Sequence, residues 1–417
     1  MTPDDELKRP LSVLHISMWD NVGGSGRAAY RLHTGLQRLG VQSRMLVGQK
    51  RTRDEKVRTI GGPLNRLDKL IGRTVDRMDL QYLFYPSSLF LPGMRWVREA
   101  DVIQLFNTHG GYLSHFALIP LSKNRPVIWR LSDMWALTGH CSYSYECERW
   151  KTGCGDCPHL EEYPKLKRDN TSALWFTKKR IYERSRLTIV APSQWLAGLA
   201  KQSPLLNRFP IHWIPNGLDT NVFHPIPKAA VRQRLGLDPK TRVILFSASS
   251  VRLERKGATI FREALGKLAA DGLKDVTLLI VGEGGERWQP EGPFSVKTLG
   301  PIYDDEMLAA AYSAADLFVL PTLADNLPNG IIESMACGTP AVSFDVGGVR
   351  EVVRHMETGY LAVARDSDNL ANGIRSLIRD DDGRSRMGRR CREVAETEYP
   401  LDLQARRFEQ LYRGLLS

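Results

Sequence analysis

Two carboxylates, Asp325 and Glu333, stand eight residues apart where an apolar run at 317–321 gives way to a helix-forming segment. A helix that begins at the carboxyl end of a strand offers free backbone N–H groups and a positive dipole end, which together bind anions. Asp325 precedes this turn and can face a polyol. Glu333, inside the helix, can accept hydrogen bonds from two ribose hydroxyls, because an ionised carboxylate only accepts. The alternative is structural: an aspartate that caps the helix and a glutamate on its surface.

A second candidate site is a cluster of thiols, in which four of the six cysteines fall within 17 residues. The cluster comprises Cys141, Cys147, Cys154 and Cys157. The last two are separated by Gly-Asp, which is knuckle spacing, and four thiolates suit tetrahedral zinc. The sequence therefore predicts a structural zinc ion in an insertion at about 138–160. Three alternatives stay open: His140 or His159 as a replacement ligand, two disulfides, or reduced cysteines packed in a loop.

A third candidate is the glycine-rich segment 21–27, which includes Gly23 and Gly24 and separates a predicted strand from a helix predicted over 28–39. Glycines let the backbone approach a phosphate closely. Doubly wound folds commonly have such a turn, so the segment by itself is a weak indicator.

Apolar runs of strand length alternate with helix-length amphipathic segments along the whole chain. Near-continuous Val/Ile/Leu runs are typical of parallel sheets buried on both faces, and this alternation predicts βαβ units. The predicted strands are 12–17, 43–48, 101–106, 126–131, 187–191, 243–248, 276–281, 317–321 and 340–344. The turn-rich segment 214–217 marks a boundary, so we expect two doubly wound domains, 1–220 and 221–398, facing a cleft. A proline-started helix follows at 399–417 and is expected to return to the first domain.

The charge of the chain is unevenly distributed. Residues 1–220 contain 32 basic and 20 acidic side chains, a net charge of +12, whereas the other 197 residues have a net charge of −1. Such a surface attracts anions, although simple solubility explains it equally well. Residues 64–80 place apolar side chains on one helical face with basic ones around them, as in an interfacial membrane helix or, in the simpler interpretation, a surface helix of a basic protein. The composition is that of a globular protein, and no apolar stretch is long enough for a membrane span. The polar start of the chain indicates no secretory signal, so we expect a cytoplasmic protein with reduced cysteines.

The segment Asp325-x7-Glu333 followed by Ser-Met-Ala-Cys-Gly-Thr-Pro resembles the E-x7-E signature of the retaining family 4 glycosyltransferases. The resemblance implies a GT-B fold, with two Rossmann-like domains and a nucleotide-sugar held mainly by the second. By this resemblance Glu333 binds the donor ribose, Asp325 faces the donor sugar as a catalytic residue, and the turn between them contacts the diphosphate. Those turn residues are Asn326, Leu327, Pro328 and Asn329.

The same resemblance extends to other donor-binding segments. Residues 251–257 resemble the Arg…Lys-Gly segment that grips the donor diphosphate, with Lys256 as its lysine and Arg252 or Arg255 in place of its arginine. Cations there neutralise the leaving group, so no catalytic metal is expected. Glu283 lies in a loop that resembles the one around the nucleobase, and the turn with Gly23 and Gly24 lies in the family across the cleft from the donor.

In the first half, residues 101–112 resemble the family segment D-V-I-H-L-H-N-x-H-G-G-Y, and residues 129–135 resemble W-T-L-H-D-x-W. Three family histidines are replaced, two of them by Phe106 and Ser132, while His109 remains. Phe106 stands where the family often has a histidine near the donor sugar. His109 is therefore the remaining candidate for a catalytic histidine, and a hydrogen-bonded structural residue is the alternative.

Together these features predict a retaining hexosyltransferase that moves a sugar from a nucleotide-diphosphate donor to a glycan in polysaccharide biosynthesis. The expected acceptor is an anionic or polyprenyl-diphosphate-linked glycan, reached by peripheral contact with the inner face of the cell membrane. Alternatives are a GT-B epimerase or hydrolase of nucleotide sugars, and a non-catalytic GT-B scaffold subunit. A zinc-dependent nucleic-acid binder is the most remote, and no nucleic-acid partner is expected.

Overall fold

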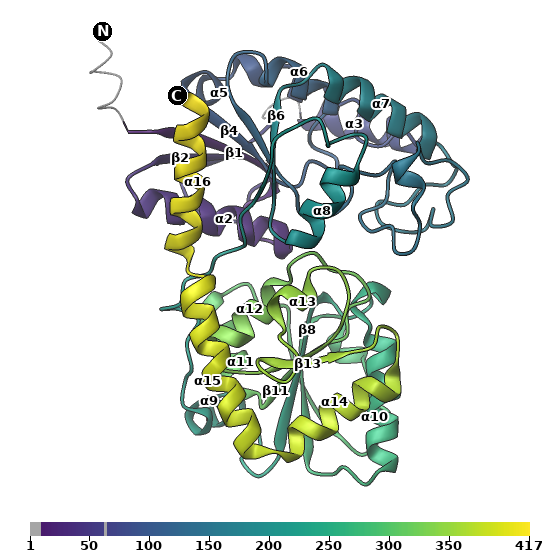
Figure 1. Ribbon diagram of the computed structural model, residues 1–417, viewed down its shortest axis with the longest axis vertical. Coiled ribbons are helices and arrows are strands. Elements are labelled where there is room, and N and C mark those ends of the chain that lie inside the picture. The colour runs from purple at the N-terminus through teal and green to yellow at the C-terminus, as the bar shows by residue number, and fades with distance from the viewer. Residues whose placement is uncertain (1–9, 62–64) are drawn as a thin grey trace. The chain divides into compact units, whose positions relative to one another are not determined.

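The computed structural model describes residues 10–61 and 65–417 and divides the chain into two compact units (Figure 1). The first extends to Gly217 and includes Asp402–Ser417, and the second is Leu218–Leu401. All nine predicted strands are present, with ends that differ from the prediction by at most two residues. Within the described ranges, no helix combines the length and apolar character needed to span a bilayer.

The first unit is built on a seven-stranded parallel sheet in the order β3-β2-β1-β4-β5-β6-β7. The strands are β1 (Ser12–Trp19), β2 (Gln42–Gln49), β3 (Val57–Thr59), β4 (Val102–Leu105), β5 (Val127–Arg130), β6 (Leu187–Ala191) and β7 (Ile211–Trp213). Strands β4, β5 and β6 are buried along their whole length. This explains their near-continuous apolar sequences, because helices cover both faces of such a sheet.

Helices and short helical turns connect these strands. They are α2 (Gly23–Arg38), α3 (Asn65–Arg77), α4 (Pro86–Leu89), η2 (Leu91–Gly93), α5 (Arg95–Glu99), η3 (His115–Ala117), α6 (Leu118–Leu121), η4 (Arg149–Lys151), α7 (Thr171–Glu183), α8 (Gln194–Gln202) and α16 (Leu401–Leu416). Apolar residues of α2 and α16, including Leu32, Phe408 and Tyr412, share one core cluster with the sheet. Helix α16 therefore contributes to the core of the first unit, although the whole second unit precedes it in sequence.

The helix predicted over 28–39 begins five residues earlier, at Gly23. The glycine-rich segment is thus the first turn of α2 and not a separate loop. Gly23 has a φ of +67°, a conformation open to glycine, and Gly26 packs so closely that a Cβ would lie 3.0 Å from the Cβ of Trp19. These glycines let the helix start directly at the end of β1.

The second unit is built on a six-stranded parallel sheet in the order β10-β9-β8-β11-β12-β13. The strands are β8 (Arg242–Ser250), β9 (Val276–Glu283), β10 (Ser295–Gly300), β11 (Leu317–Leu320), β12 (Ala341–Phe344) and β13 (Gly359–Ala362). The helical elements are α9 (Lys228–Leu235), η5 (Glu254–Lys256), α10 (Ala258–Ala270), η6 (Gly285–Arg287), α11 (Asp305–Ala314), α12 (Asn329–Ala336), α13 (Val349–Val352), α14 (Ser367–Arg379) and α15 (Asp381–Glu398).

Successive side chains of the central strand β8 enter two different cores. Val243 and Leu245 pack with α11 and α12, whereas Ile244 and Phe246 pack with α10 and α14. This is the alternation expected of a strand with a helical layer on each face. The sheet is therefore doubly wound.

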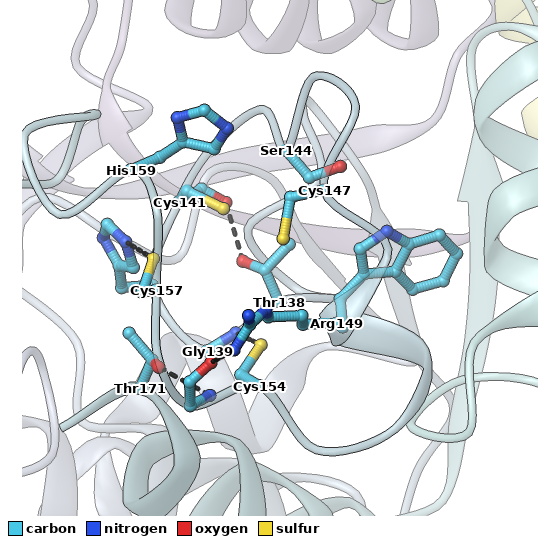
Figure 2. Close-up of a pocket in the computed structure, with 13 residues that line it drawn as sticks. Thr138, Gly139, Cys141, Ser144, Cys147, Arg149, Cys154, Cys157, His159 and Thr171 are labelled. Atoms are coloured by element: carbon cyan, nitrogen blue, oxygen red, sulfur yellow. Dashed lines mark hydrogen bonds between the residues drawn. The ribbon is translucent and has the colours of Figure 1, made fainter. Parts of the chain in front are cut away.

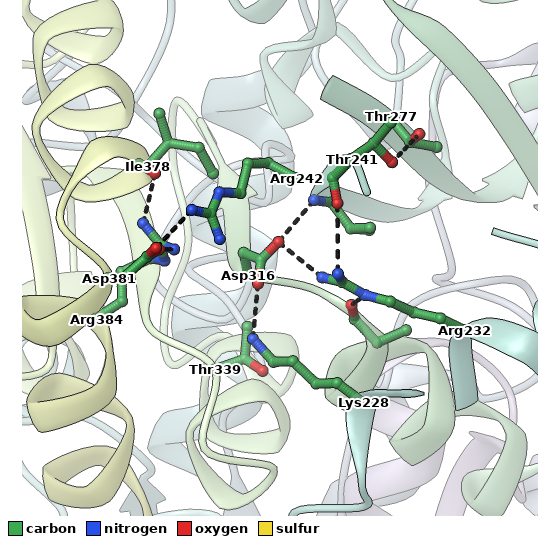
Figure 3. Close-up of polar contacts among 12 residues, drawn as sticks. Lys228, Arg232, Thr241, Arg242, Thr277, Asp316, Thr339, Ile378, Asp381 and Arg384 are labelled. Atoms are coloured by element: carbon green, nitrogen blue, oxygen red, sulfur yellow. Dashed lines mark hydrogen bonds and ion pairs between the residues drawn. The ribbon is translucent and has the colours of Figure 1, made fainter. Parts of the chain in front are cut away.

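A buried carboxylate ties three elements of the second unit together (Figure 3). Asp316, which precedes β11, accepts hydrogen bonds from Lys228 Nζ at 2.8 Å, Arg232 Nη2 at 2.7 Å and the backbone N–H of Val243 at 2.8 Å. Although burial raises the pKa of Asp316, the charge of Lys228, the Val243 N–H and Arg232 outweigh it and lower the pKa. Helix α9 is thereby anchored to the start of β8 and β11.

Candidate active site

The short helical turn η5 is docked against the loop that follows β11. The carbonyl oxygen of Arg255 accepts hydrogen bonds from the N–H of Leu323 at 2.7 Å and the Thr322 hydroxyl at 3.2 Å. Gly257, at φ +72°, ends the turn, and a Cβ there would lie 1.8 Å from the carbonyl oxygen of Pro321. Only glycine permits this close approach.

This docking brings two cations to the first carboxylate of the predicted pair. Lys256 Nζ lies 2.6 Å from Asp325 Oδ2, and Arg255 Nη1 lies 3.6 Å from the same oxygen. Burial raises the pKa of Asp325, but the charges of Lys256 and Arg255 outweigh it, so that the pKa is lowered. Burial also lowers the pKa of Lys256, an effect that the charge of Asp325 opposes. The cluster of Arg255, Lys256 and Asp325 has a net charge of +1 when ionised and is thus suited to bind an anion.

The turn between Asp325 and α12 is well ordered by its own contacts. Asn326 is buried and its N–H donates to Asp325 Oδ1 at 3.1 Å, while Leu327 is also buried. Pro328 is the N-cap residue of α12, and Asn329 is its first residue. Asp325 therefore does not cap the helix, which excludes the simple structural explanation for this aspartate. The N-terminus of α12 follows four residues after the Lys256–Asp325 ion pair.

Glu333 lies in the interior of the second unit and is not a surface glutamate. Its side chain is 3% exposed, and Oε2 accepts a hydrogen bond from the Tyr312 hydroxyl at 3.1 Å. Tyr312 comes from α11, so this bond joins α11 to α12. An acceptor-only carboxylate held in this way has a fixed orientation, as a group that binds vicinal hydroxyls requires.

The other donor-binding candidates of the second unit are Glu283, the last residue of β9, and Arg252, which lies between β8 and η5. The carbonyl oxygen of Glu283 accepts from the N–H of Val251, and the Glu283 side chain is exposed. A Cβ on Gly284 would lie 2.9 Å from Nε of Arg252, so Arg252 lies against the loop after β9. Of the two candidate arginines, Arg255 is thus the one that the structure places beside Asp325.

In the first unit, the glycine-rich start of α2 is connected to the segment that resembles W-T-L-H-D-x-W. Ser25, which follows Gly23 and Gly24, lies with its Oγ 2.7 Å from Oγ of Ser132. Ser132 also accepts a hydrogen bond from Arg130 Nη1 at 3.3 Å. A serine in this position therefore joins β5 to α2.

His109 is held by a carboxylate and by aromatic rings. Its Nε2 lies 2.8 Å from Oδ2 of Asp133, and the rings of Tyr82, Trp135 and Tyr163 are within 6.4 Å of its ring, between centroids. Since a carboxylate accepts, Nε2 carries the proton and Nδ1 is left as an acceptor. Nδ1 is buried and has no hydrogen-bond partner among the described residues. Phe106 is fully buried in the core of the first unit, so its ring is not available to a ligand.

The four predicted zinc ligands line a single pocket in the first unit (Figure 2). None of the six cysteines, all within the described part of the chain, forms a disulfide, which argues against the two-disulfide alternative. Across residues 10–61 and 65–417, no three His, Cys, Asp or Glu side chains are already placed as the ligands of a metal ion. Burial raises the pKa of Cys141 to about 12 and that of Cys154 to about 11.

The family model described as Glycosyltransferase Family 4 matches residues 22–222, and that described as Glycosyl transferases group 1 matches residues 241–380. The chain belongs to the family 4, group 1 glycosyltransferases.

Curated relatives of this family member are similar over part of the chain. A D-inositol 3-phosphate glycosyltransferase of Segniliparus rotundus is 32% identical over 211 residues, 48% of this chain and 46% of the relative. The phosphatidyl-myo-inositol mannosyltransferase of Mycobacterium leprae is 35% identical over 173 residues, 40% of this chain and 44% of the relative. A putative colanic acid biosynthesis glycosyl transferase of Escherichia coli K12, WcaC, is 28% identical over 235 residues, which are 55% of this chain and 54% of the relative. The chain thus spans about half the length of the curated relatives it matches.

Solved structures show the fold. Anabaena HepE, in complex with UDP and glucose, superposes with a TM-score of 0.69 at 17% identity and covers 97% of this chain and 100% of that one. Sucrose-phosphate synthase of Thermosynechococcus elongatus has a TM-score of 0.66 at 20% identity, and the superposition covers 97% of this chain and 99% of the synthase. The expectation of two Rossmann-like domains in a GT-B fold is confirmed.

Two side chains at these candidate sites were not predicted from the sequence. Tyr312 orients Glu333, and Asp133 orients His109. Asp133 lies within the quoted segment 129–135, where an aspartate next to two tryptophans was a usable signal. Tyr312 lies 21 residues from Glu333 on another helix, and no local pattern indicates that the two meet.

Proposed function

We propose that this chain is a retaining hexosyltransferase that uses a nucleotide-diphosphate sugar and extends a glycan or lipid-linked glycan in polysaccharide biosynthesis. The observation that carries the proposal is the ion pair of Lys256 and Asp325 at the turn into α12, with buried Glu333 one further turn along that helix. The relative named for colanic acid biosynthesis and the neighbour with bound UDP and glucose support the choice of donor and pathway class.

The roles follow from charge and position. Lys256 and Arg255 offset the negative charge that develops on the departing diphosphate, together with the backbone N–H groups of Leu327, Asn329 and Gly330. Glu333 accepts from the ribose hydroxyls of the donor. Asp325 faces the sugar, where its negative charge stabilises a positively charged transition state. The bond from the sugar C1 to the diphosphate breaks as the bond to the acceptor oxygen forms on the same face, and the acceptor proton passes to the leaving diphosphate.

The first experiment is a thermal-shift screen of the purified chain against a panel of nucleotide sugars. A donor at ~100 times its dissociation constant adds roughly 2.7 kcal/mol of stability, which is readily observed. Glu333→Ala removes the shift, whereas Glu306→Ala, an exposed glutamate on α11, leaves it intact. A shift that persists in Glu333→Ala contradicts the assignment of the ribose site.

Activity assays with the same preparation distinguish the proposed transferase from two alternatives, one enzymatic and one non-enzymatic. An epimerase or hydrolase consumes the donor when no acceptor is present. A scaffold subunit binds the donor but transfers its sugar to no acceptor, and the full burial of Phe106 is the observation that favours this second function. A transferase shows transfer to a lipid-linked glycan with little donor loss in its absence.

We propose further that His109 is the catalytic histidine of the first unit, oriented by Asp133. The buried Nδ1, which has no hydrogen-bond partner among the described residues, supports this, since an imidazole nitrogen can accept a hydrogen bond or a proton. His109→Gln is expected to lower transfer while the donor-induced thermal shift stays unchanged. A variant with normal transfer and a lowered melting temperature assigns His109 to packing instead.

Peripheral contact with an anionic membrane belongs to the same proposal. Exposed apolar side chains concentrate between residues 67 and 90, where α3 and α4 are joined by the bond from the Ser87 N–H to Asp68. This apolar patch comprises Leu67, Leu70, Met78, Phe84, Leu89 and Phe90, and Arg66, Arg73 and Arg77 are exposed beside them on α3. Apolar side chains with flanking arginines suit an anionic interface.

Flotation with vesicles that contain anionic lipid tests this contact. Binding at low salt is expected to weaken in Leu70→Ser/Phe90→Ser, both 64% exposed, but not in Phe176→Ser, a 49% exposed residue on α7. Equal flotation of all three proteins, or none by the unmodified chain, contradicts the proposal.

A further inference from the structure

The pocket lined by the four clustered cysteines is the strongest feature of the first unit that the transferase proposal leaves unused. Cys141 is buried, and Cys147, Cys154 and Cys157 are half-buried. Figure 2 shows all four among the residues that line one pocket, on separate stretches of the loop between β5 and α7. Reduced thiols that converge from distant positions of one loop suit a single ion better than four independent packing roles.

The backbone at the last two cysteines has an unusual conformation. Cys154 and Asp156 have positive φ values of 57° and 43°, with Gly153 and Gly155 beside them at 125° and 92°. For the two non-glycine residues this conformation is costly unless the surroundings hold it, whereas glycine adopts it readily. The knuckle 154–157 is held by the Gly155 N–H to the Thr171 hydroxyl at 2.9 Å and the Cys157 N–H to Asp169 at 2.6 Å.

Two of the sulfur atoms have polar partners within the loop. The N–H of Gly139 donates to Sγ of Cys154 at 3.2 Å. Nε2 of His140 lies 3.4 Å from Sγ of Cys157, while Nδ1 of the same ring donates to the carbonyl oxygen of Pro164 at 2.9 Å. A histidine ring fixed in this way is typical of the surroundings of a metal site.

The buried amine of Lys178 lies close to the cluster. Lys178, 3% exposed, donates to the carbonyl oxygens of Trp135 at 2.7 Å and Thr138 at 2.9 Å, and its ammonium lies near enough to Cys141 and Cys154 to interact electrostatically. Buried charges in proteins are paired or ligate metals. Zn²⁺ with four thiolates has a net charge of −2, which Lys178 offsets in part.

We propose that Cys141, Cys147, Cys154 and Cys157 bind one zinc ion as a closed tetrathiolate site, with Lys178 and the Gly139 N–H as its compensating groups. The side chains as they stand are not yet arranged as ligands, so binding requires their sulfur atoms to turn inward. The site has no open position, and its role is structural.

The loop that holds the four cysteines is linked to the surroundings of His109. Ser142 links the loop to its neighbours: its carbonyl accepts from the N–H of Met134 at 2.9 Å, and its N–H donates to Tyr163 at 2.8 Å. Tyr163 packs edge-on against the His109 ring, with centroids 5.5 Å apart. Zinc bound in this loop therefore fixes the segment that packs against His109.

Metal content of the full chain, purified under reducing conditions and dialysed against zinc-free buffer, tests the proposal. One zinc per chain is expected by mass spectrometry, with loss in Cys154→Ser and in Cys157→Ser. Cys337→Ser and Cys391→Ser are matched controls, because both thiols are buried in the second unit, and they retain the metal. A chain without zinc, or zinc retained by both knuckle variants, overturns the proposal.

A second measurement does not depend on variants that fold. Replacement of zinc by cobalt(II) in the unmodified chain is expected to give thiolate-to-cobalt charge-transfer absorption and the strong visible bands of a tetrahedral site. Six titratable thiols are expected after unfolding with a chelator. Two thiols, with the rest in disulfides, or a cobalt spectrum without thiolate bands, overturns the proposal. Neither result bears on donor binding, so this inference and the proposed function fail independently.

Discussion

Asp325 shares its negative charge between Lys256 and the sugar that we expect it to face. Asp325→Asn keeps the shape of the side chain and removes that charge. Because Lys256 is then released from its 2.6 Å partner, donor binding is expected to persist or tighten, while transfer falls by roughly 100-fold or more. Calorimetric donor binding and the initial rate of transfer measure the two effects, and Asp382→Asn, exposed on α15, serves as control. Unchanged transfer would refute the assigned role.

The candidate site residues were more predictable from the sequence than the side chains that contact them. Asp325 and Glu333 are recognisable from spacing, since the turn and helix between them are local. The candidate arginines could not be distinguished, because the choice depends on how η5 docks on the loop at Thr322 and Leu323. Contacts of this kind join segments about 70 residues apart and leave no trace in local sequence patterns.

At the scale of secondary-structure elements, the turn from η5 into α10 is the one that builds the cationic part of the site. Gly257→Ala introduces a Cβ at 1.8 Å from the Pro321 carbonyl, whereas Gly272→Ala introduces one with nothing within 4 Å, at a similar φ of +77°. Both variants carry the backbone strain of a positive φ, about 1 kcal/mol. Only Gly257→Ala is expected to displace Lys256 and abolish the donor-induced thermal shift. Equal donor responses in the two variants would contradict this role of the turn.

The strands that the sequence analysis missed share one property. They are β3, β7, β10 and β13, the outermost strands of the two sheets. Each is short or largely exposed, so none shows the continuous apolar run by which the inner strands were found. Prediction from apolar runs therefore finds the centre of a doubly wound sheet and stops one strand short at each edge.

At the scale of the whole second unit, stability depends on the Asp316 cluster of Figure 3. Asp316→Asn leaves Arg232, 11% exposed, without its carboxylate and is expected to cost roughly 2–4 kcal/mol. Asp368→Asn, which removes a carboxylate that is 76% exposed and pairs with the 39% exposed Lys267, is expected to cost less than about 1 kcal/mol. Urea denaturation of both variants measures the difference. Equal losses would show that burial does not decide the effect.

The pH dependence of that loss has a defined sign. The pKa of Asp316 is lower in the folded chain than in the unfolded one, so its stabilisation is complete above the unfolded pKa of about 4 and is lost as the pH falls through the folded value. The difference in unfolding free energy between the unmodified chain and Asp316→Asn should therefore be constant from pH 6 to 8, because this range begins about two units above that pKa. In acid the difference should become smaller. A difference that grows in acid would contradict the assignment.

The core of the first unit includes side chains of α16, a helix that lies far from the rest of this unit in the sequence. Phe408→Ala, at a fully buried position of α16, is expected to destabilise this unit by about 3–5 kcal/mol, whereas Leu416→Ala, 48% exposed on the same helix, is expected to be nearly neutral. Hydrogen exchange resolved by segment should show the loss in β1, β2 and β4 and not in β8 or β11. Uniform loss across both sheets would contradict it.

This shared core imposes an order on biosynthesis. Residues up to Gly217 leave the ribosome first, yet Phe408 and Tyr412, whose hydroxyl donates to Gln104, emerge only after the whole second unit has been translated. At about 5–20 residues per second, the nascent first unit waits roughly ten seconds or more with an apolar surface uncovered. Chaperones that shield nascent chains are therefore expected to matter more for this protein than for a protein whose domains are each built from continuous sequence.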